Sequence, residues 1–171
     1  LLRLHDGLEV ECVIIPISSK HSSLCVSSQV GCSRGCAFCS TGTMGLIRSL
    51  TTEEILIQVW RALRLVREQN LPPLVNIIFM GMGEPLNNLD AVSDAVEQLV
   101  SPDAFAFSRR NVCVSTVGPS PQLIRKAGRL PCRLAWSVHA ADDDLRKQLV
   151  PTTRHSMVEL RDAFVETLAN K

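Results

Sequence analysis

The sequence contains no tyrosine, few other aromatic residues, almost no excess charge and no long apolar run. Phenylalanine and tryptophan make up 4% of its 171 residues, and 18 lysines and arginines face 17 aspartates and glutamates, a net charge of +1. This balance provides no overall field that attracts nucleic acid, so RNA contacts need local patches. Apolar runs fall short of the roughly 18 residues of a membrane helix. Charge near Leu1 interrupts any signal-peptide core, and the missing initiator methionine predicts a fragment.

The chain is rich in hydrophobic residues and contains an odd number of cysteines. Hydrophobic residues make up 46%, charged residues 20%, and the mean hydropathy is +0.15, which predicts one compact domain and excludes a disordered chain. Seven cysteines, three of them within eight residues, fit a reducing compartment and metal chemistry better than a disulfide framework. We therefore expect a cytoplasmic protein, or one of an organelle matrix or stroma in a eukaryote.

Hydrophobic periodicity predicts alternating strands and helices. Strands are expected over residues 8–17, 24–30, 74–80, 111–115 and 133–138. Helices are expected after the capping box at 51–54 as far as Pro72, over 92–99, from Ser120-Pro121, and from Ser156 to the chain end at Lys171. Consecutive strand-helix units predict an α/β fold with parallel strands and right-handed crossovers, and nothing marks a second domain.

The residues with the most chemical potential all follow predicted strands. In parallel α/β folds, the loops after the carboxyl ends of the strands build the active site. We therefore expect one face of the molecule to collect Cys32, Cys36, Cys39, Glu84, Ser115, Ser137 and His139.

The cysteine loop C-S-R-G-C-A-F-C, residues 32–39, contains three thiols, and glycines at 31 and 35 allow a tight backbone. Three soft ligands suit an iron-sulfur cluster or zinc. A closed structural site usually has four protein ligands, so three indicate a 4Fe-4S cluster with one open iron. Zinc would need Cys25 or His21 as the fourth ligand, and the spacing leaves this alternative open.

The loop, with Phe38 before its last cysteine, resembles the cluster loop of radical S-adenosylmethionine (SAM) enzymes, in which the open iron binds the amine and carboxylate of SAM. The segments CVSSQVGC (25–32), GMGEP (81–85), VST (114–116) and SVH (137–139) occur in the order found in the RlmN/Cfr family of radical SAM RNA methyltransferases. The chain resembles the RlmN type over nearly its whole length. This implies a partial (β/α) radical SAM barrel with an N-terminal β-strand extension, and methylation of adenine C2 in 23S ribosomal RNA and in tRNA.

The resemblance assigns SAM binding to six residues at strand ends: Gly83, Glu84, Ser115, Ser137, Val138 and His139. The residues themselves allow this, because Gly81 and Gly83 could admit a ligand close to the backbone and Glu84 offers an anion to an amine. The alternative is a plain strand-to-helix turn with an exposed acid, together with capping serines and a structural histidine.

The resemblance also implies two catalytic residues. Cys25 matches a cysteine that works with a methyl-carrying cysteine near the family's C-terminus. A radical derived from SAM activates the carried methyl group, which adds to adenine, and Cys25 releases the RNA by forming a disulfide with the carrier. Glu11 aligns with a proton acceptor, with Glu9 as a rival. The remaining cysteines are expected to pack in the fold: Cys12, Cys113 and Cys132.

The remaining expectations concern partners and missing parts. The resemblance implies an external electron donor of the flavodoxin or ferredoxin type, a monomer and no membrane. Arg34 and Arg48 are candidate RNA contacts. Residues 1–171 are expected to be an incomplete radical SAM core, without the N-terminal RNA-recruiting domain and the C-terminal strands that bear the carrier. Open alternatives are a Cfr-type adenine C8 methyltransferase, a zinc-stabilised RNA-binding module without catalysis, and a truncated, non-functional product.

Overall fold

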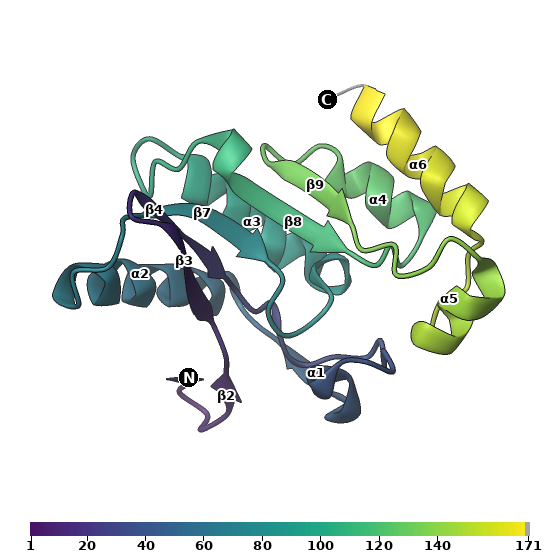
Figure 1. Ribbon diagram of the computed structural model, residues 1–171, viewed down its shortest axis with the longest axis horizontal. Helices are drawn as coiled ribbons and strands as arrows, with labels where there is room; N and C mark the ends of the chain where they lie inside the picture. Colours follow the sequence, from purple (N-terminus) through teal and green to yellow (C-terminus); the bar gives the residue numbers. More distant parts are fainter. Residues whose placement is uncertain (170–171) are drawn as a thin grey trace.

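The computed structural model describes residues 1–169, and a five-stranded sheet forms its centre (Figure 1). The strands are arranged in the order β3 (Val13–Ser18), β4 (His21–Cys25), β7 (Leu74–Phe79), β8 (Val112–Thr116) and β9 (Arg133–Trp136). β4, β7, β8 and β9 are parallel, and β3 pairs with β4 in the antiparallel sense at one edge. The predicted α/β class with an N-terminal β extension is confirmed.

Two short antiparallel ribbons flank the sheet: β1 (Leu2–Arg3) with β2 (Glu9–Val10), and β5 (Gln29–Gly31) with β6 (Leu46–Ser49). Residues 8–17 and 24–30, each expected as one strand, are therefore each divided between two sheets. The breaks fall where the backbone changes partner, since β4 pairs with the central sheet and β5 with β6. β4 already begins at His21, so the turn before it is shorter than the gap between the two expected strands.

The helices are α1 (Ser40–Thr43), α2 (Thr52–Glu68), α3 (Leu89–Val100), α4 (Pro121–Ala127), α5 (Asp143–Leu149) and α6 (Met157–Ala169), with 3-10 turns η1 (Pro85–Asn88) and η2 (Arg109–Asn111). Figure 1 shows α3 and α4 behind the sheet, and α6 packs on α4. Within residues 1–169, no helix is both long enough and apolar enough to cross a membrane.

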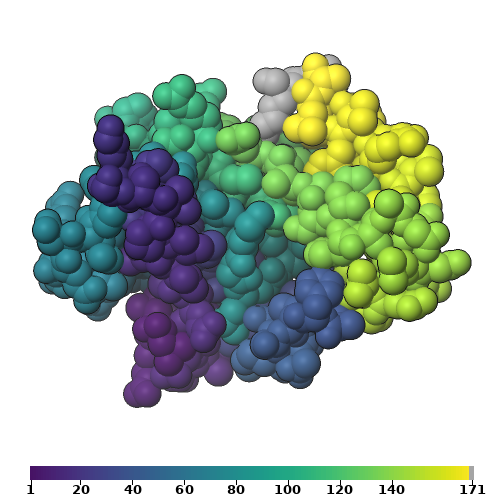
Figure 2. All heavy atoms as spheres, in the orientation of Figure 1, coloured from purple at the N-terminus to yellow at the C-terminus, as the bar shows by residue number. Residues whose placement is uncertain are grey.

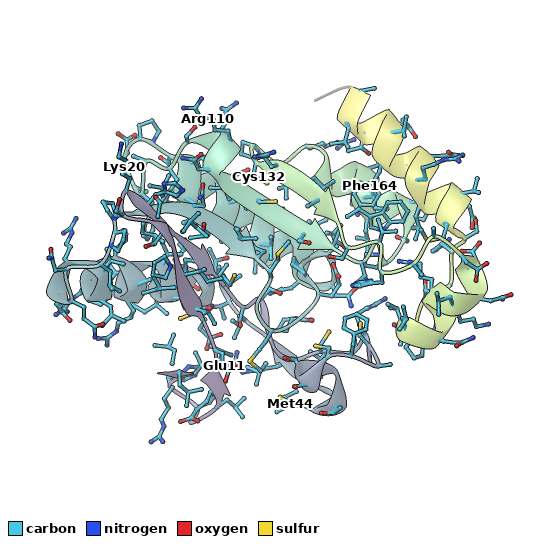
Figure 3. All side chains as sticks on the ribbon, in the orientation of Figure 1. Glu11, Lys20, Met44, Arg110, Cys132 and Phe164 are labelled. Atoms are coloured by element: carbon cyan, nitrogen blue, oxygen red, sulfur yellow. The ribbon has the colours of Figure 1, made fainter. Side chains whose placement is uncertain are left out.

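The main apolar core lies between the sheet and helices α2 and α3. Leu24, Ile77 and Phe79 of the sheet and Ile55 and Val96 of the helices are almost completely buried there. Burying such a side chain stabilises the fold by about 1.5–3 kcal/mol. A smaller cluster joins α4, α6 and β9, where the rings of Trp136 and Phe164 stack with centroids 5.1 Å apart (Phe164 is labelled in Figure 3).

The local helix signals are confirmed. The Thr51 hydroxyl accepts from the Glu54 backbone N–H at 3.2 Å, and the Glu54 carboxylate accepts from the Thr51 N–H at 3.0 Å, which completes the predicted capping box. The Ser120 hydroxyl caps α4 as predicted. α2 ends at Glu68, before Pro72, because the chain turns at Asn70 with a φ of 52°.

Two features near the C-terminal part differ from the sequence prediction. β9 ends at Trp136, before residue 138, and the backbone becomes left-handed at His139, with a φ of 65°. α5, which was not predicted, lies between β9 and the expected last helix. The expectation that this helix reaches Lys171 lies outside the described residues.

Candidate functional site

A cavity of about 280 Å³ opens at the carboxyl edge of the parallel strands. Four separate segments line it: the cysteine loop, the loop after β7, and the ends of β8 and β9. In Figure 2 the blue cysteine segment adjoins the yellow-green segment around residues 140–150, and the Ala37 N–H donates to the Leu149 carbonyl at 2.9 Å. The cavity brings together eight residues singled out from the sequence: Cys32, Cys36, Cys39, Gly83, Glu84, Ser115, Ser137 and His139.

The base of the cysteine loop requires glycine. Gly31 has a φ of 76°, and a Cβ atom there would lie 1.9 Å from the Gly45 carbonyl oxygen. The same carbonyl accepts a hydrogen bond from the Cys32 N–H at 2.9 Å. The close approach of the β5 and β6 backbones therefore fixes where the first cysteine begins the loop.

The three loop thiols lie in a partly dry environment. Burial raises the pKa of Cys32, and burial together with the neighbouring thiols raises the pKa of Cys36. Both thiols therefore carry protons near neutral pH, and a metal must displace them. The three cysteines line one cavity, where they would hold a cluster.

The geometry bears on the zinc alternative. Within residues 1–169, no group of three His, Cys, Asp or Glu side chains is already arranged to hold a metal ion, so this observation does not separate zinc from a cluster. His21 lies at the start of β4, about 13 Å along the strand from Cys25, and its ring contacts the Ser18 hydroxyl at 3.1 Å. The cysteine loop lies beyond the other end of this strand, so His21 is badly placed as a fourth ligand.

Arg34 provides a test of whether the cavity fits an anionic group. Its Nη2 donates to the Asn87 side-chain oxygen at 3.2 Å, whereas its buried Nε has no hydrogen-bond partner among the described residues. An unpaired buried donor is costly unless an acceptor joins it. Three thiols and this cation line one cavity, so the residues present fit an iron-sulfur cluster, whose sulfur atoms are anionic.

Glu84 is a buried acid, with 2% of its surface exposed. Its Oε1 accepts from the Thr116 hydroxyl at 2.6 Å and the Leu86 N–H at 3.0 Å, and its Oε2 accepts from the Val117 N–H at 3.0 Å. Burial raises the pKa of Glu84, and these hydrogen bonds oppose the rise. The alternative of a plain turn with an exposed acid is therefore wrong. A carboxylate offers about four acceptor positions, so room for one more donor remains.

The glycines of this loop make room for the chain itself. A Cβ atom at Gly81 would lie 2.6 Å from the Ser27 Oγ, and one at Gly83, where φ is 99°, would lie 2.6 Å from the Gln29 Cβ. The absence of side chains lets the segment after β4 pack closely, and Gln29 then accepts from the Glu84 N–H at 2.9 Å. Both glycines also line the cavity, so the expectation that they admit a ligand close to the backbone stays a prediction.

The far wall of the cavity combines hydroxyls with two rings. The Ser115 and Ser137 hydroxyls are 2.9 Å apart. The His139 ring lies 4.8 Å from the Phe38 ring, measured between centroids, and burial lowers the pKa of His139, so the imidazole is neutral at pH 7. Val138 differs from its neighbours, because it does not line the cavity.

Arg146, which was not predicted from the sequence, stabilises the backbone next to Ser137 and His139. The side chain is completely buried, and it donates to the carbonyls of Val117 and Val138 and to the Thr153 hydroxyl. It therefore joins the segments that follow β8 and β9. No pattern singles it out, because Arg146 lies in the strongly polar run DDDLRKQ, which is typical of a solvated helix.

Known proteins with similar sequences identify the family of this chain. A profile of the radical SAM superfamily matches residues 26–166. The chain belongs to the radical SAM superfamily. Members of this superfamily use a 4Fe-4S cluster and SAM, which agrees with the resemblance seen in the sequence.

Relatives of this radical SAM chain are RNA methyltransferases by name. It is 47% identical to the dual-specificity RNA methyltransferase RlmN of Phenylobacterium zucineum, over 96% of this chain and 44% of that protein. It is 45% identical to the RlmN of Syntrophobacter fumaroxidans, over 94% of this chain and 46% of that protein. The resemblance to the RlmN type is confirmed, and the Cfr type is not favoured.

A solved structure shares the fold. The crystal structure of a radical SAM methyltransferase from Sphaerobacter thermophilus is 40% identical, with a TM-score of 0.90 over 98% of this chain and 49% of that one. This match supports the interpretation of the sheet as part of a radical SAM barrel. The chain spans about half the length of the proteins it matches.

The two residues expected to be catalytic lie beside the cavity, outside its lining. Cys25 ends β4 between Val13 and Ile78, and burial raises its pKa. Glu11 is exposed two residues before Val13, near the edge where β4 ends, and Figure 3 shows it far from Arg110. The rival Glu9 pairs with Arg3 at 3.2 Å.

The structure gives Arg48 a different setting from the predicted RNA contact. Its guanidinium forms ion pairs of 2.7 Å with both Glu54 and Asp6, and the hydrogen bonds that it donates to Glu54 are the main reason that the pKa of Arg48 is raised. Arg48 thus links β6 to the capping box of α2 and to the N-terminal turn.

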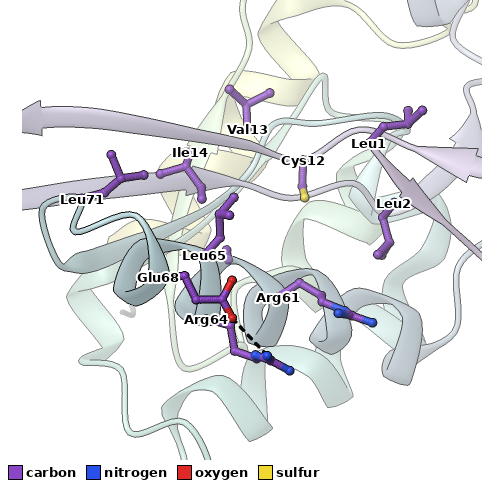
Figure 4. A pocket seen from close by; sticks show the side chains of 11 residues that line it. Leu1, Leu2, Cys12, Val13, Ile14, Arg61, Arg64, Leu65, Glu68 and Leu71 are labelled. Carbon is purple, nitrogen blue, oxygen red and sulfur yellow. Dashed lines mark hydrogen bonds and ion pairs between the residues drawn. The ribbon is translucent and has the colours of Figure 1, made fainter.

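A larger cavity, of about 620 Å³, lies between β3 and α2 (Figure 4). Leu1, Ile14 and Leu65 are among its mainly apolar lining, with Cys12 as its single cysteine and an Arg64–Glu68 ion pair of 3.0 Å at its edge. Its size would favour this cavity as the functional site, but the three loop thiols and the buried acid Glu84 line the smaller cavity. Cys12 packs against the apolar core and Cys132 is part of it, as expected, while Cys113 lies half-buried on β8.

Proposed function

We propose that this chain is the cluster- and SAM-binding part of a methyltransferase that modifies C2 of adenine in 23S ribosomal RNA and in tRNA. The observation that carries the proposal is the single cavity in which three thiols, a buried carboxylate and two strand-end hydroxyls meet. The names of the relatives support an RNA substrate. Because the chain spans less than half of these relatives, the activity is proposed for the whole protein.

In this proposal Cys32, Cys36 and Cys39 hold a 4Fe-4S cluster. The cluster, with SAM bound and an electron supplied, provides the radical chemistry needed to methylate an unactivated aromatic carbon. The protein's own contribution is to gather the thiols, to keep them in a partly dry loop and to hold one face of the site open at the strand ends.

SAM binding is assigned to the opposite wall. The free acceptor position of Glu84 suits the ammonium group of the methionyl part, and a buried carboxylate gives a strong charge-assisted hydrogen bond. The hydroxyls of Ser115 and Ser137 provide polar contacts, and Phe38 and His139 offer ring surfaces to a flat base. Gly83 shapes the loop that presents Glu84. Val138 belongs to this set by resemblance alone.

The remaining assignments rest on the resemblance. Cys25 resolves the link between protein and RNA, and Glu11 accepts a proton. An external donor of the flavodoxin or ferredoxin type supplies electrons. The protein acts as a monomer in the cytoplasm, or in an organelle matrix or stroma.

Anaerobic reconstitution with iron and sulfide tests the cluster. We expect a brown protein with about four irons per chain. Cys36→Ala should lose the colour, whereas Cys12→Ala, a cysteine change at the other cavity, should keep it. Stoichiometric zinc without labile sulfide in anaerobic preparations would show that the loop is a zinc site.

Calorimetry tests the ligand. SAM should bind measurably only to the cluster-loaded protein, because chelation by the open iron supplies much of its affinity. Equal SAM affinity with and without iron would contradict the proposed role of the loop.

A further inference from the structure

Arg34 is a cation inside the cysteine loop. It lies between Cys32 and Cys36 in the sequence and lines the same cavity as their thiols. No ion pair with a carboxylate is found for it in the described part of the chain, and its buried Nε has no hydrogen-bond partner there. A buried guanidinium donor of this kind lacks an anionic acceptor.

The side chain is held in this position from several directions. Its Nη2 donates to Asn87, whose own amide donates to the Ser33 hydroxyl at 3.3 Å. The Arg34 backbone N–H donates to the Cys32 sulfur at 3.5 Å, and the Arg34 carbonyl accepts from the Thr152 hydroxyl at 3.0 Å. These contacts hold the half-buried Arg34 beside the loop.

The charged and titratable groups around Arg34 are the loop thiols and Glu84. The three hydrogen bonds that Glu84 accepts come from Leu86, Thr116 and Val117, and none comes from Arg34. Arg34 therefore places a positive charge beside the thiols that no carboxylate pairs within the described residues. With the cluster proposed above, the group that the thiols bind contains anionic sulfur.

We propose that Arg34 provides a fixed positive charge beside the cluster, and thereby raises its reduction potential. One electron from the external donor converts the oxidised cluster into a form with one more negative charge. A nearby cation and hydrogen bonds to sulfur stabilise that form relative to the oxidised one. This inference rests on the proposed function, because it requires the cluster.

Potentiometric titration with dithionite, followed by electron paramagnetic resonance, tests it on the reconstituted chain without SAM. Arg34→Gln should shift the midpoint potential to a more negative value, because it removes the charge. Arg34→Lys should shift it less, because the positive charge remains. Asn87→Ala should give an intermediate shift by releasing the guanidinium. The control is Arg161→Gln, an exposed α6 arginine paired with Asp162, which should leave the potential unchanged.

The outcomes separate this inference from the proposed function. If Arg34→Gln and Asn87→Ala both assemble the cluster at the wild-type potential, the inference is overturned. A loss of SAM affinity at unchanged potential also overturns it, since the charge would then serve the ligand. If Arg34→Gln assembles no cluster, the midpoint potentials of Arg34→Lys and Asn87→Ala decide whether the inference holds. A wild-type chain that assembles no cluster overturns both, whereas a normal wild-type cluster leaves the proposed function intact.

Discussion

The Thr116 hydroxyl donates a 2.6 Å hydrogen bond to Oε1 of Glu84, and this contact joins the end of β8 to the loop after β7. Together with the bond from Val117, it holds a carboxylate in a buried position where water does not compensate its charge. The strand end and the acid therefore form one unit, and the chemistry of the cavity depends on both.

The first prediction concerns the pH dependence of SAM binding. Burial raises the pKa of Glu84, so the anion that an ammonium group needs is lost at a higher pH than for an ordinary glutamate. We expect SAM affinity of the cluster-loaded protein to rise as pH increases through this raised pKa. Glu84→Gln should bind more weakly and lose this rise, while Asp90→Asn, on the exposed first turn of α3, should keep both. Calorimetry across pH makes the comparison, and an unchanged profile in Glu84→Gln would contradict it.

The second prediction compares two glycines of one hairpin. Gly31 and Gly45 both have a positive φ, 76° and 69°. A Cβ atom at Gly31 would lie 1.9 Å from the Gly45 carbonyl oxygen, whereas a Cβ atom at Gly45 would have no neighbour within 4 Å. Gly45→Ala should lower the free energy of unfolding by about 1–2 kcal/mol through strain alone. Gly31→Ala adds backbone overlap and should cost at least about 1–3 kcal/mol more. Urea denaturation measures both, and equal losses would show that the hairpin adapts.

The third prediction concerns the ion pair that supports α2. The hydrogen bond from Arg48 lowers the pKa of Glu54, so this group stabilises the fold above its unfolded pKa, and the stabilisation is lost as pH falls through the lowered folded pKa. Glu54→Gln should therefore lower stability at pH 7 by about 1–2 kcal/mol and lower it less at acid pH. Denaturation at pH 7 and near pH 3 measures the difference, with Glu68→Gln at an exposed pair as control. A constant loss at both pH values would contradict the role of the charge.

The sequence predicted those parts of the fold that local patterns determine. The capping box at Thr51 and the apolar run of β7 are read from neighbouring residues, because the signal and the structure have the same range. β6 was missed because its residues 46–49 form a strand only by pairing with β5, a contact between segments far apart in the chain. α5 was missed because seven mostly charged residues provide no apolar periodicity.

The residues of the candidate site likewise divide into those that the sequence predicts and those that only the structure shows. The strand-end rule predicts that Glu84, Ser115 and His139 meet at one cavity, because the carboxyl ends of parallel strands share an edge. Arg146 could not be found in this way. A buried charge has the same appearance in a sequence as an exposed one, and only the carbonyls around it show its function.

The fourth prediction follows from that burial. Arg146→Leu removes the charged donor from the Val117 and Val138 carbonyls, which each keep one other donor, the Trp136 Nε1–H and the Ala140 N–H. We expect a loss of about 2–4 kcal/mol in the free energy of unfolding, because a hydrogen bond to a charged group contributes about 1.5–3 kcal/mol. Arg161→Gln, at an exposed pair, should change it by less than about 0.5 kcal/mol. Similar small losses for both would show that the strand-end segments hold themselves in place.

The last prediction separates Cys25 from the cluster. Cys25 does not line the cavity, so Cys25→Ala should assemble the same iron content as the wild type, whereas Cys36→Ala should not. In a full-length relative with the equivalent change, the carrier cysteine should still be methylated, but RNA linked to protein should accumulate because no thiolate displaces it. Burial raises the pKa of Cys25, so in the unchanged enzyme the thiolate fraction, and with it the rate of RNA release, should rise with pH above neutrality. Gel analysis of crosslinked RNA against pH measures both effects, and normal release from the alanine variant would assign the resolving step to another group.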